Sequence, residues 1–142
     1  MQIQSMLLTL MAATVVYLSG CRTINTPFPT PEQIATADYG APLTIDWQEA
    51  VKVWAFKNLK DPSSARYIFK GPPQKGYIHT FLNTTEFNYV TVVEVNSKDD
   101  SGNYSGFLPY LFVFKKNHII KVVKPGDFRY DPETGGADLY LQ

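Results

Sequence analysis

The stretch that decides the fold is Phe87-Asn-Tyr-Val-Thr-Val-Val-Glu-Val-Asn96, in the second half of the chain. Aromatic and β-branched residues dominate it, and these residue types favour a strand over a helix. Polar residues that form turns lie on both sides, at 83–86 and at 98–103. The sequence therefore predicts a long strand here, entered and left by turns.

Shorter strands are predicted around this one. They are expected at 66–69, 75–82, 106–115 and 118–123. The last two are joined by the tight turn Lys116-Asn117. Because short connections force neighbouring strands to run antiparallel, we predict an antiparallel meander of four to five strands. Pro109 interrupts one of them, so that strand is expected at a sheet edge or bulged at this residue.

One helix is predicted before the sheet, over residues 45–59. Asp46, followed three residues later by Glu49, is typical of a helix start. Trp47 and Trp54 recur with other apolar residues at three- and four-residue spacing and form one face. We interpret these tryptophans as side chains that pack the helix on the sheet; a pair that stacks on a ligand is the alternative. The predicted fold class is α+β, with one N-terminal helix packed on the antiparallel meander.

The start of the chain has the features of an export signal. Met6 to Leu18 is uncharged and mostly apolar, and it is too short for a membrane span, which needs about 20 apolar residues. Leu18-Ser-Gly-Cys21 follows, and Cys21 is the single cysteine. This motif resembles the lipobox of bacterial lipoproteins. The resemblance implies that residues 1–20 are a signal peptide cut between Gly20 and Cys21. It also implies that the Cys21 thiol carries a diacylglyceryl group and that the new amine is acylated, with palmitate as the expected acyl group.

The first residues depart from the usual signal pattern, because 1–5 contain no lysine or arginine. The alternatives to lipid attachment are an ordinary cleaved signal peptide and an uncleaved N-terminal helix. Arg22 stands where some lipoproteins carry an aspartate that retains them in the inner membrane. The resemblance therefore implies sorting to the outer membrane of the bacterial cell envelope, with the domain in the periplasm.

Residues 21–43 are predicted to be a proline-rich tether. Prolines at alternate positions from 27 to 31 favour an extended, polyproline-like spacer. A ligand for an aromatic groove is the alternative. The expected organisation is then a single α+β domain over 44–124 and a C-terminal tail over 125–142. In the tail, 137–141 is a candidate short strand that adds to a partner's sheet, packs on its own domain, or frays.

Composition restricts the partners and the forces that hold the fold. The chain has 13 Lys and Arg against 13 Asp and Glu, a formal net charge of zero. Nucleic-acid-binding domains carry excess positive charge, so no nucleic-acid partner is expected. With Cys21 acylated, no cysteine remains for a disulfide, and the apolar core must hold the domain. Hydrophobic residues, at 44% of the chain, supply the material for that core.

Three motifs in the predicted domain resemble a family of small bacterial lipoproteins. They are Asp61-Pro-Ser-Ser-Ala-Arg-Tyr-Ile-Phe69, Val95-Asn-Ser-Lys98 and Gly102-Asn-Tyr-Ser-Gly106, within a resemblance over roughly residues 45–124. Asp99-Asp100 departs from the family pattern, where asparagine is usual, and the tail is extended. The resemblance implies a fold and no activity, so it assigns no catalytic residue.

Three candidate chemical sites each have a simpler interpretation. The stretch Asp99-Asp-Ser-Gly-Asn103 has the composition of a calcium loop without the EF-hand spacing, so we predict a hairpin turn. His79 and His118 lie far apart in the sequence, and without a spare cysteine a structural zinc site is not expected. Ser105 lacks the glycine spacing of a nucleophile elbow, so a hydrolase that pairs Ser105 with a histidine is only an alternative.

The sequence therefore predicts a protein that is not an enzyme and has no metal or small-molecule cofactor. We expect a lipid-anchored module that contacts the membrane through its lipid and binds or stabilises another envelope protein. A periplasmic inhibitor or immunity-type protein against a cognate enzyme is the first alternative. A cell-wall glycan binder that uses Tyr104 and Tyr110, or a small envelope enzyme, is the second. A wide apolar surface would favour protein binding, and a concave pocket with converging polar groups would favour the last alternative.

Overall fold

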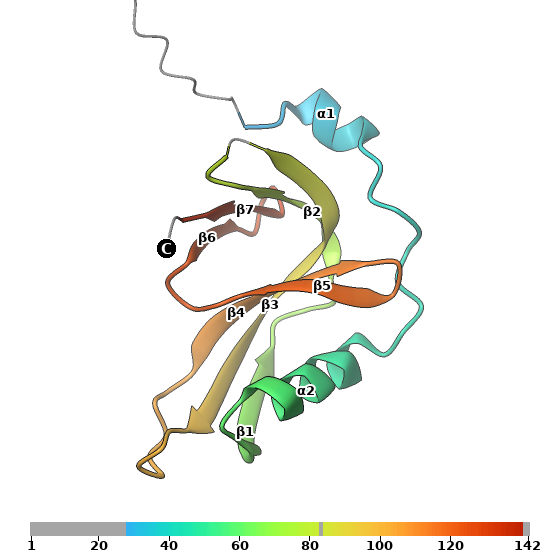
Figure 1. Cartoon of the computed structure of the whole chain (residues 1–142). Coiled ribbons are helices and arrows are strands. Elements are labelled where there is room, and N and C mark those ends of the chain that lie inside the picture. The colour runs from blue at the N-terminus through green and yellow to red at the C-terminus, as the bar shows by residue number, and fades with distance from the viewer. Residues whose placement is uncertain (1–27, 83, 141–142) are drawn as a thin grey trace, which may run out of the picture.

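Strand β3 (Thr85–Lys98) is the strand predicted at 87–96, extended by two residues at each end. The computed structural model describes residues 28–82 and 84–140 (Figure 1). Seven strands form one sheet and two short helices accompany it, so the fold is mixed α/β. The other elements are α1 (Pro31–Thr36), α2 (Trp47–Asn58), β1 (Asp61–Phe69), β2 (Gln74–His79), β4 (Leu108–Lys115), β5 (His118–Val123), β6 (Phe128–Asp131) and β7 (Gly136–Leu139).

The strands lie in the order β5-β4-β3-β2-β7-β6, and β1 also pairs with β3. The neighbours from β2 to β5 run antiparallel, as predicted. The predicted count of four to five strands is wrong, because β6 and β7 continue the sheet. The wholly antiparallel meander is also wrong, because β2 and β7 run parallel. Both added strands have only four residues, too few to produce a recognisable alternation in the sequence.

Helix α2 confirms the predicted helix and its start. The Asp46 side chain accepts hydrogen bonds from two backbone N–H groups of the first turn, each at 3.1 Å. Trp47 meets Phe69 edge-on, with 5.3 Å between ring centroids. Trp54 meets Phe112 in the same way at 5.2 Å. Both tryptophans therefore pack the helix on the sheet, and the packing interpretation is confirmed.

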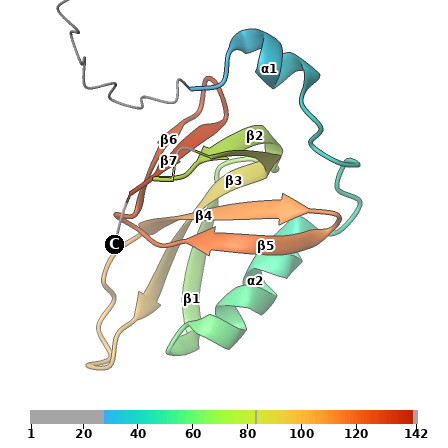
Figure 2. The ribbon, with the colours of Figure 1, turned by 45° about the horizontal axis from the view of Figure 1, so that its top comes forward.

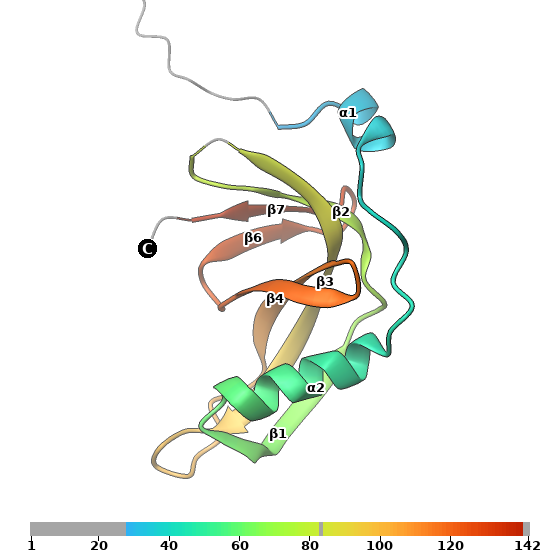
Figure 3. The same cartoon turned by 45° about the vertical axis from the view of Figure 1, so that its right-hand side comes forward.

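Side chains alternate along each strand between the two faces of the sheet and form a separate apolar cluster on each face. On one face, Val93 of β3 joins Phe112 of β4 and Val51 of α2 in a first core cluster. On the other face, Val90 of β3 and Ala137 of β7 belong to a second cluster. Figures 1 and 2 show β2, β6 and β7 at one end of the molecule and α2 with β1 at the other. Helix α2 therefore covers one face at its end of the sheet, and neither of the two described helices lies over the opposite face (Figure 3).

Strands β1 and β2 pair with the same edge of β3, one after the other. Phe69 lies opposite Val93 and Gln74 lies opposite Val90, so the four residues 70–73 face only two residues of β3. The Thr91 hydroxyl connects β3 to this segment by donating a hydrogen bond to the backbone carbonyl of Gly71, at 3.0 Å. We call residues 70–73 the bulge. Three of its residues, Lys70, Gly71 and Pro72, line a cleft on the face opposite α2.

The predicted tail belongs to the sheet. Strands β6 and β7 form a hairpin, and β7 lies against β2 so closely that only glycine fits. A Cβ atom on Gly76 would lie 2.2 Å from the carbonyl oxygen of Gly135, and one on Gly136 would lie 2.3 Å from the Tyr77 ring. Of the alternatives stated for 137–141, packing on the same domain is the one observed for the part within β7.

The prediction of an extended tether is wrong over α1. Thr30 caps this helix, and Thr30 and Gln33 exchange side-chain to backbone hydrogen bonds of 3.2 and 2.8 Å. Pro31 is tolerated because the first helical position needs no N–H donor. Residues 21–27, the start of the tether, lie outside the described residues. Neither of the two described helices has the length and apolarity to cross a membrane.

Pro109 lies in β4, which has β3 on one side and β5 on the other. Strand β5 pairs only from Leu111 onward, so Pro109 faces Glu94 of β3 and none of the seven described strands pairs with it on its other side. The predicted edge environment is thus present locally, although β4 is not an edge strand. The predicted tight turn between β4 and β5 is confirmed, with positive φ angles of 49° and 63° at Lys116 and Asn117.

Candidate functional site

A cleft of about 510 Å³ lies on the sheet face opposite α2. Its walls come from the bulge, from strands β2, β3, β4 and β6, and from the loops on both sides of β6. Apolar side chains dominate the lining, among them Pro72, Val92, Pro109, Phe128 and Tyr130. This volume lies in the range of cavities that bind small molecules or side chains of a partner.

The polar groups around the cleft are mostly bonded to one another. Lys70 Nζ lies 2.7 Å from Glu94 Oε1, and these two side chains form an ion pair on the rim. The Thr91 hydroxyl is already used as a donor to the Gly71 carbonyl. Few polar groups are therefore left to converge on a small polar ligand, and the cleft is suited to an apolar one.

Two further polar side chains, those of Gln74 and Tyr130, line the cleft. Burial raises the pKa of Tyr130 above its ordinary value, and the nearby Asp131 carboxylate raises it further. The phenol therefore stays protonated at neutral pH.

A row of alternating residues, two in β1 and the first residue of the bulge, extends from the cleft along the same face. Arg66 and Ile68 of β1 point to this side, since Ile68 lies directly opposite Glu94 on β3, and Lys70 joins them through its ion pair with Glu94. Ile68 is 40% exposed, which is high for an isoleucine in a strand. We call this row, together with the cleft, the open face.

The far end of the open face is positively charged. The Arg66 guanidinium lies 4.4 Å from the centroid of the Tyr104 ring, and Lys98 Nζ lies 5.6 Å from it. Tyr104 is fixed there by its hydroxyl, which donates to the Ser64 carbonyl at 3.2 Å. Within the described residues, neither cation forms an ion pair. Both charges are therefore available to an acidic group, apart from their contact with the ring.

The three motifs that carry the lipoprotein resemblance meet at this end of the sheet. Lys98 N donates to Ser64 Oγ at 2.9 Å, which joins the second motif to the first. Gly106 N donates to Asn96 Oδ1 at 3.1 Å, which joins the third motif to the second. Their serine, asparagine and tyrosine side chains thus hold the start of β1 against the end of β3. This arrangement gives the motifs a structural role.

Asp61 supplies a pH-dependent prediction at this junction. Its carboxylate accepts hydrogen bonds from Ser63 Oγ at 2.7 Å and from Ser64 N at 3.3 Å. The pKa of Asp61 is lowered mainly by the Ser63 hydrogen bond. Burial opposes this effect, and the hydrogen bonds of Ser64 and the Lys98 charge lower the pKa further. A lowered folded-state pKa stabilises the domain above the unfolded pKa of about 3.9, and the effect is lost as the pH falls through the folded value.

We therefore expect Asp61→Asn to be less stable than wild type at neutral pH. The difference should shrink below about pH 4, as the wild-type carboxyl becomes protonated. Urea midpoints measured from neutral pH downward test this expectation. A difference between the two proteins that stays constant with pH would contradict it.

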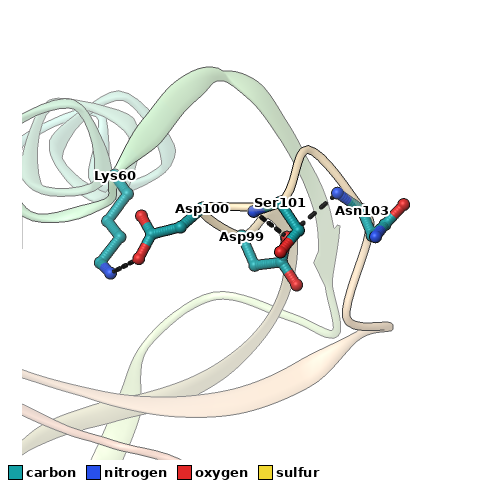
Figure 4. A network of polar contacts seen from close by, with 5 residues as sticks. All are labelled: Lys60, Asp99, Asp100, Ser101 and Asn103. Atoms are coloured by element: carbon teal, nitrogen blue, oxygen red, sulfur yellow. Dashed lines mark hydrogen bonds and ion pairs between the residues drawn. The ribbon is translucent and has the colours of Figure 1, made fainter.

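The turn after β3 confirms the predicted hairpin turn. Asp99 Oδ1 accepts hydrogen bonds from the backbone N–H groups of Ser101, at 2.8 Å, and Asn103, at 3.1 Å. Asp100 instead pairs with Lys60 at the end of α2 (Figure 4). The two carboxylates are thus directed to different partners. In 28–82 and 84–140, no three His, Cys, Asp or Glu side chains come together as a metal site.

Ser105 and the two histidines are not brought together. His79 lies beside Thr85 at the start of β3, with 3.0 Å between Nδ1 and Oγ1, whereas Ser105 follows the other end of that strand. Those ends are separated by about 45 Å of strand. His118 starts β5, at the end of β4 remote from Ser105, and β3 and β4 separate it from His79 in the sheet.

The tyrosines of the glycan-binding alternative lie on different surfaces. Tyr110 packs against Trp54 of α2, with 5.6 Å between ring centroids. Tyr104 lies over Arg66 near the start of β1. They do not form a joint stacking surface.

The cleft itself was missed by sequence reasoning. Gly71-Pro72-Pro73 lies between the predicted strands 66–69 and 75–82 and received no functional role, although two prolines next to a strand are a signal for a bulge. Phe128 and Tyr130 lay in a segment predicted as tail. The predicted lipidation residue Cys21 and the cleavage residue Gly20 lie outside the described residues. Comparison with protein families, with curated proteins and with solved structures finds no match to this chain.

Proposed function

We propose that this chain is a lipid-anchored lipoprotein of the bacterial envelope whose domain binds another envelope protein through the open face. The observation that carries the binding role is the apolar cleft of about 510 Å³ opposite α2. The lipobox-like Leu18-Ser-Gly-Cys21 supports the anchor, and Arg22 supports the outer membrane as its location. The domain then faces the periplasm.

The chemistry of the open face defines the partner. Its cleft would take an apolar segment, because the lining is apolar and its rim charges are paired. Arg66 and Lys98 would attract a carboxylate next to that segment, about 13 Å or more from Lys70 along the strand. The partner is therefore expected to present an apolar stretch flanked by acidic residues.

A non-catalytic role is supported by the arrangement of the reactive side chains. Ser105 and His79 lie at opposite ends of β3, so His79 cannot act as a base for the Ser105 hydroxyl. The polar side chains that line the cleft are one ion pair, a threonine, a glutamine and a tyrosine, which suit recognition better than proton transfer. The inhibitor or immunity-type alternative uses the same surface and differs only in its partner, an enzyme.

The open face can be tested by photo-crosslinking in cells. A photoreactive amino acid at Gln74, an exposed cleft residue, is expected to capture one protein. The same amino acid at Phe56, which is 73% exposed on α2, is the control and should capture none or far less. Mass spectrometry of the adduct identifies the partner. Equal capture at both positions, or capture of cell-wall glycan alone, would overturn the proposal.

A charge reversal sharpens this test. Lys70→Glu places a second carboxylate beside Glu94 and is expected to lower the crosslink yield at Gln74 several-fold, about as much as the loss of 1 kcal/mol in binding. Lys52→Glu, on α2, is the matched control and should leave the yield unchanged. A captured enzyme that the purified domain inactivates would favour the inhibitor alternative over the structural one.

A further inference from the structure

Exposed apolar side chains gather where the chain enters the domain. Phe81 and Leu82, in the turn between β2 and β3, are 53% and 70% exposed, and Phe28 is 51% exposed. The Phe28 ring lies 5.3 Å from the His79 ring, which places it beside this turn. Figures 1 and 3 show α1 and the β2–β3 turn at the same end of the molecule. We call these three side chains the apolar tip.

We propose that the apolar tip inserts into the lipid surface to which the chain is anchored, and so fixes the orientation of the domain. The inference rests on the lipid attachment proposed above. It adds a second contact with the membrane, made by the folded domain.

The spacing between the anchor and the tip carries this inference. Phe28 is the seventh residue after Cys21. Even fully extended, seven residues span at most about 25 Å. A domain of about 100 residues has a radius of gyration of about 13 Å, so its diameter exceeds that reach. A lipid on Cys21 would therefore hold the Phe28 end of the domain at the membrane, and the other end could not take its place.

The turn between β2 and β3 has hydrogen-bonded polar groups and no charged side chain, so it is suited to a less polar environment. Thr80 N donates to the Thr84 carbonyl at 2.9 Å, and the two threonine hydroxyls lie 2.6 Å apart. The Thr85 hydroxyl lies 3.0 Å from His79 Nδ1. Polar groups at the base of the turn are thus already paired, which lowers the cost of removing them from water. No charged side chain lies in 80–85, so insertion would desolvate no charge there.

Insertion would also place the binding surface. Strand β3 extends away from the apolar tip for up to about 45 Å. Its other end is Lys98, which lies with Arg66 beside the Tyr104 ring. The cleft lies between the two ends, beside Val90 and Val92. The open face would stand away from the lipid, accessible to a partner in the periplasm.

Site-specific fluorescence on the lipidated full chain tests the proposal. In that chain the Cys21 sulfur carries the diacylglyceryl group, so Leu82→Cys supplies the single free thiol for an environment-sensitive dye such as nitrobenzoxadiazole. The labelled protein is reconstituted into phosphatidylethanolamine–phosphatidylglycerol vesicles, with and without nitroxide lipids. Ser101→Cys, in the exposed turn at the far end of β3, is the matched control.

We expect dye at 82 to emit at shorter wavelength in vesicles and to be quenched by nitroxide lipids, whereas dye at 101 should do neither. Adding Phe81→Asp should return the dye at 82 to its emission in water, and Phe56→Asp, on α2, should not. A dye at 82 that behaves like the dye at 101 would overturn the insertion. A shift that grows with the number of chains per vesicle would also overturn it, in favour of contact with a second copy. Dye reaction with the wild-type chain would show a free Cys21 thiol, and that outcome would overturn the lipid attachment.

Discussion

Cys21→Ala is expected to abolish fatty-acid incorporation into the chain and to leave residues 1–20 attached. The thiol is the proposed acceptor of the diacylglyceryl group, and no other cysteine can replace it. Each buried CH₂ contributes about 0.8 kcal/mol to membrane binding, so two or three chains make attachment essentially permanent. Labelled palmitate in growing cells and the intact mass of the purified chain measure this result.

Arg22→Ala is the matched control for this experiment. It changes the neighbouring residue and should leave incorporation of palmitate intact. A wild-type chain that lacks lipid but begins at a new N-terminus would indicate an ordinary signal peptide. A wild-type chain that keeps residues 1–20 would indicate an uncleaved helix. Either result would contradict the lipoprotein proposal without touching the structure of the domain.

Gly76→Ala is expected to destabilise the domain by about 3 kcal/mol or more. The added Cβ would lie 2.2 Å from the Gly135 carbonyl oxygen and 2.4 Å from a methyl group of Val90. The carbonyl belongs to the backbone and cannot move aside, so the contact between β2 and β7 must open. Because domains of this size have only about 5–15 kcal/mol of stability, the urea midpoint should fall sharply.

Gly71→Ala is the control for the same substitution type. Gly71 lies in the bulge, and no atom comes within 4 Å of the position its Cβ would occupy. The free energy of unfolding of the Gly71→Ala domain should differ from that of wild type by about 0.5 kcal/mol or less. Equal destabilisation by both substitutions would show that the glycine contact between β2 and β7 does not hold the tail of the sheet.

The elements that could be predicted are those with a strong local pattern. The β-branched run around Val92 predicts a strand from its own residues alone. The aspartate-capped segment with two tryptophans likewise predicts a helix within about a dozen residues. The β4–β5 turn is equally local, because Lys116-Asn117 must adopt positive φ to close it. These features depend on neighbouring residues and therefore appear in the sequence.

The elements that were missed depend on residues far apart in the chain. Strand β7 finds β2 through glycines at 76, 135 and 136, and no local alternation marks that meeting. The bulge is defined only by comparing the register of β1 and β2 on β3. The cleft needs both features, so its location could not be predicted. Arg66 and Lys98, at the far end of the open face, did lie in motifs that the sequence had singled out.

The pairing of Tyr77 with Gly136 also sets an order of events during biosynthesis. A nascent chain emerges from its N-terminus, so α2 and β1 to β5 can assemble before β7 has been made. Phe128 and Tyr130 form one wall of the cleft and are held to β2 through β7. A chain that has been made only as far as β5 therefore lacks this wall of the cleft. Under the proposed function, the open face would become able to bind its partner only after the last two strands have been made.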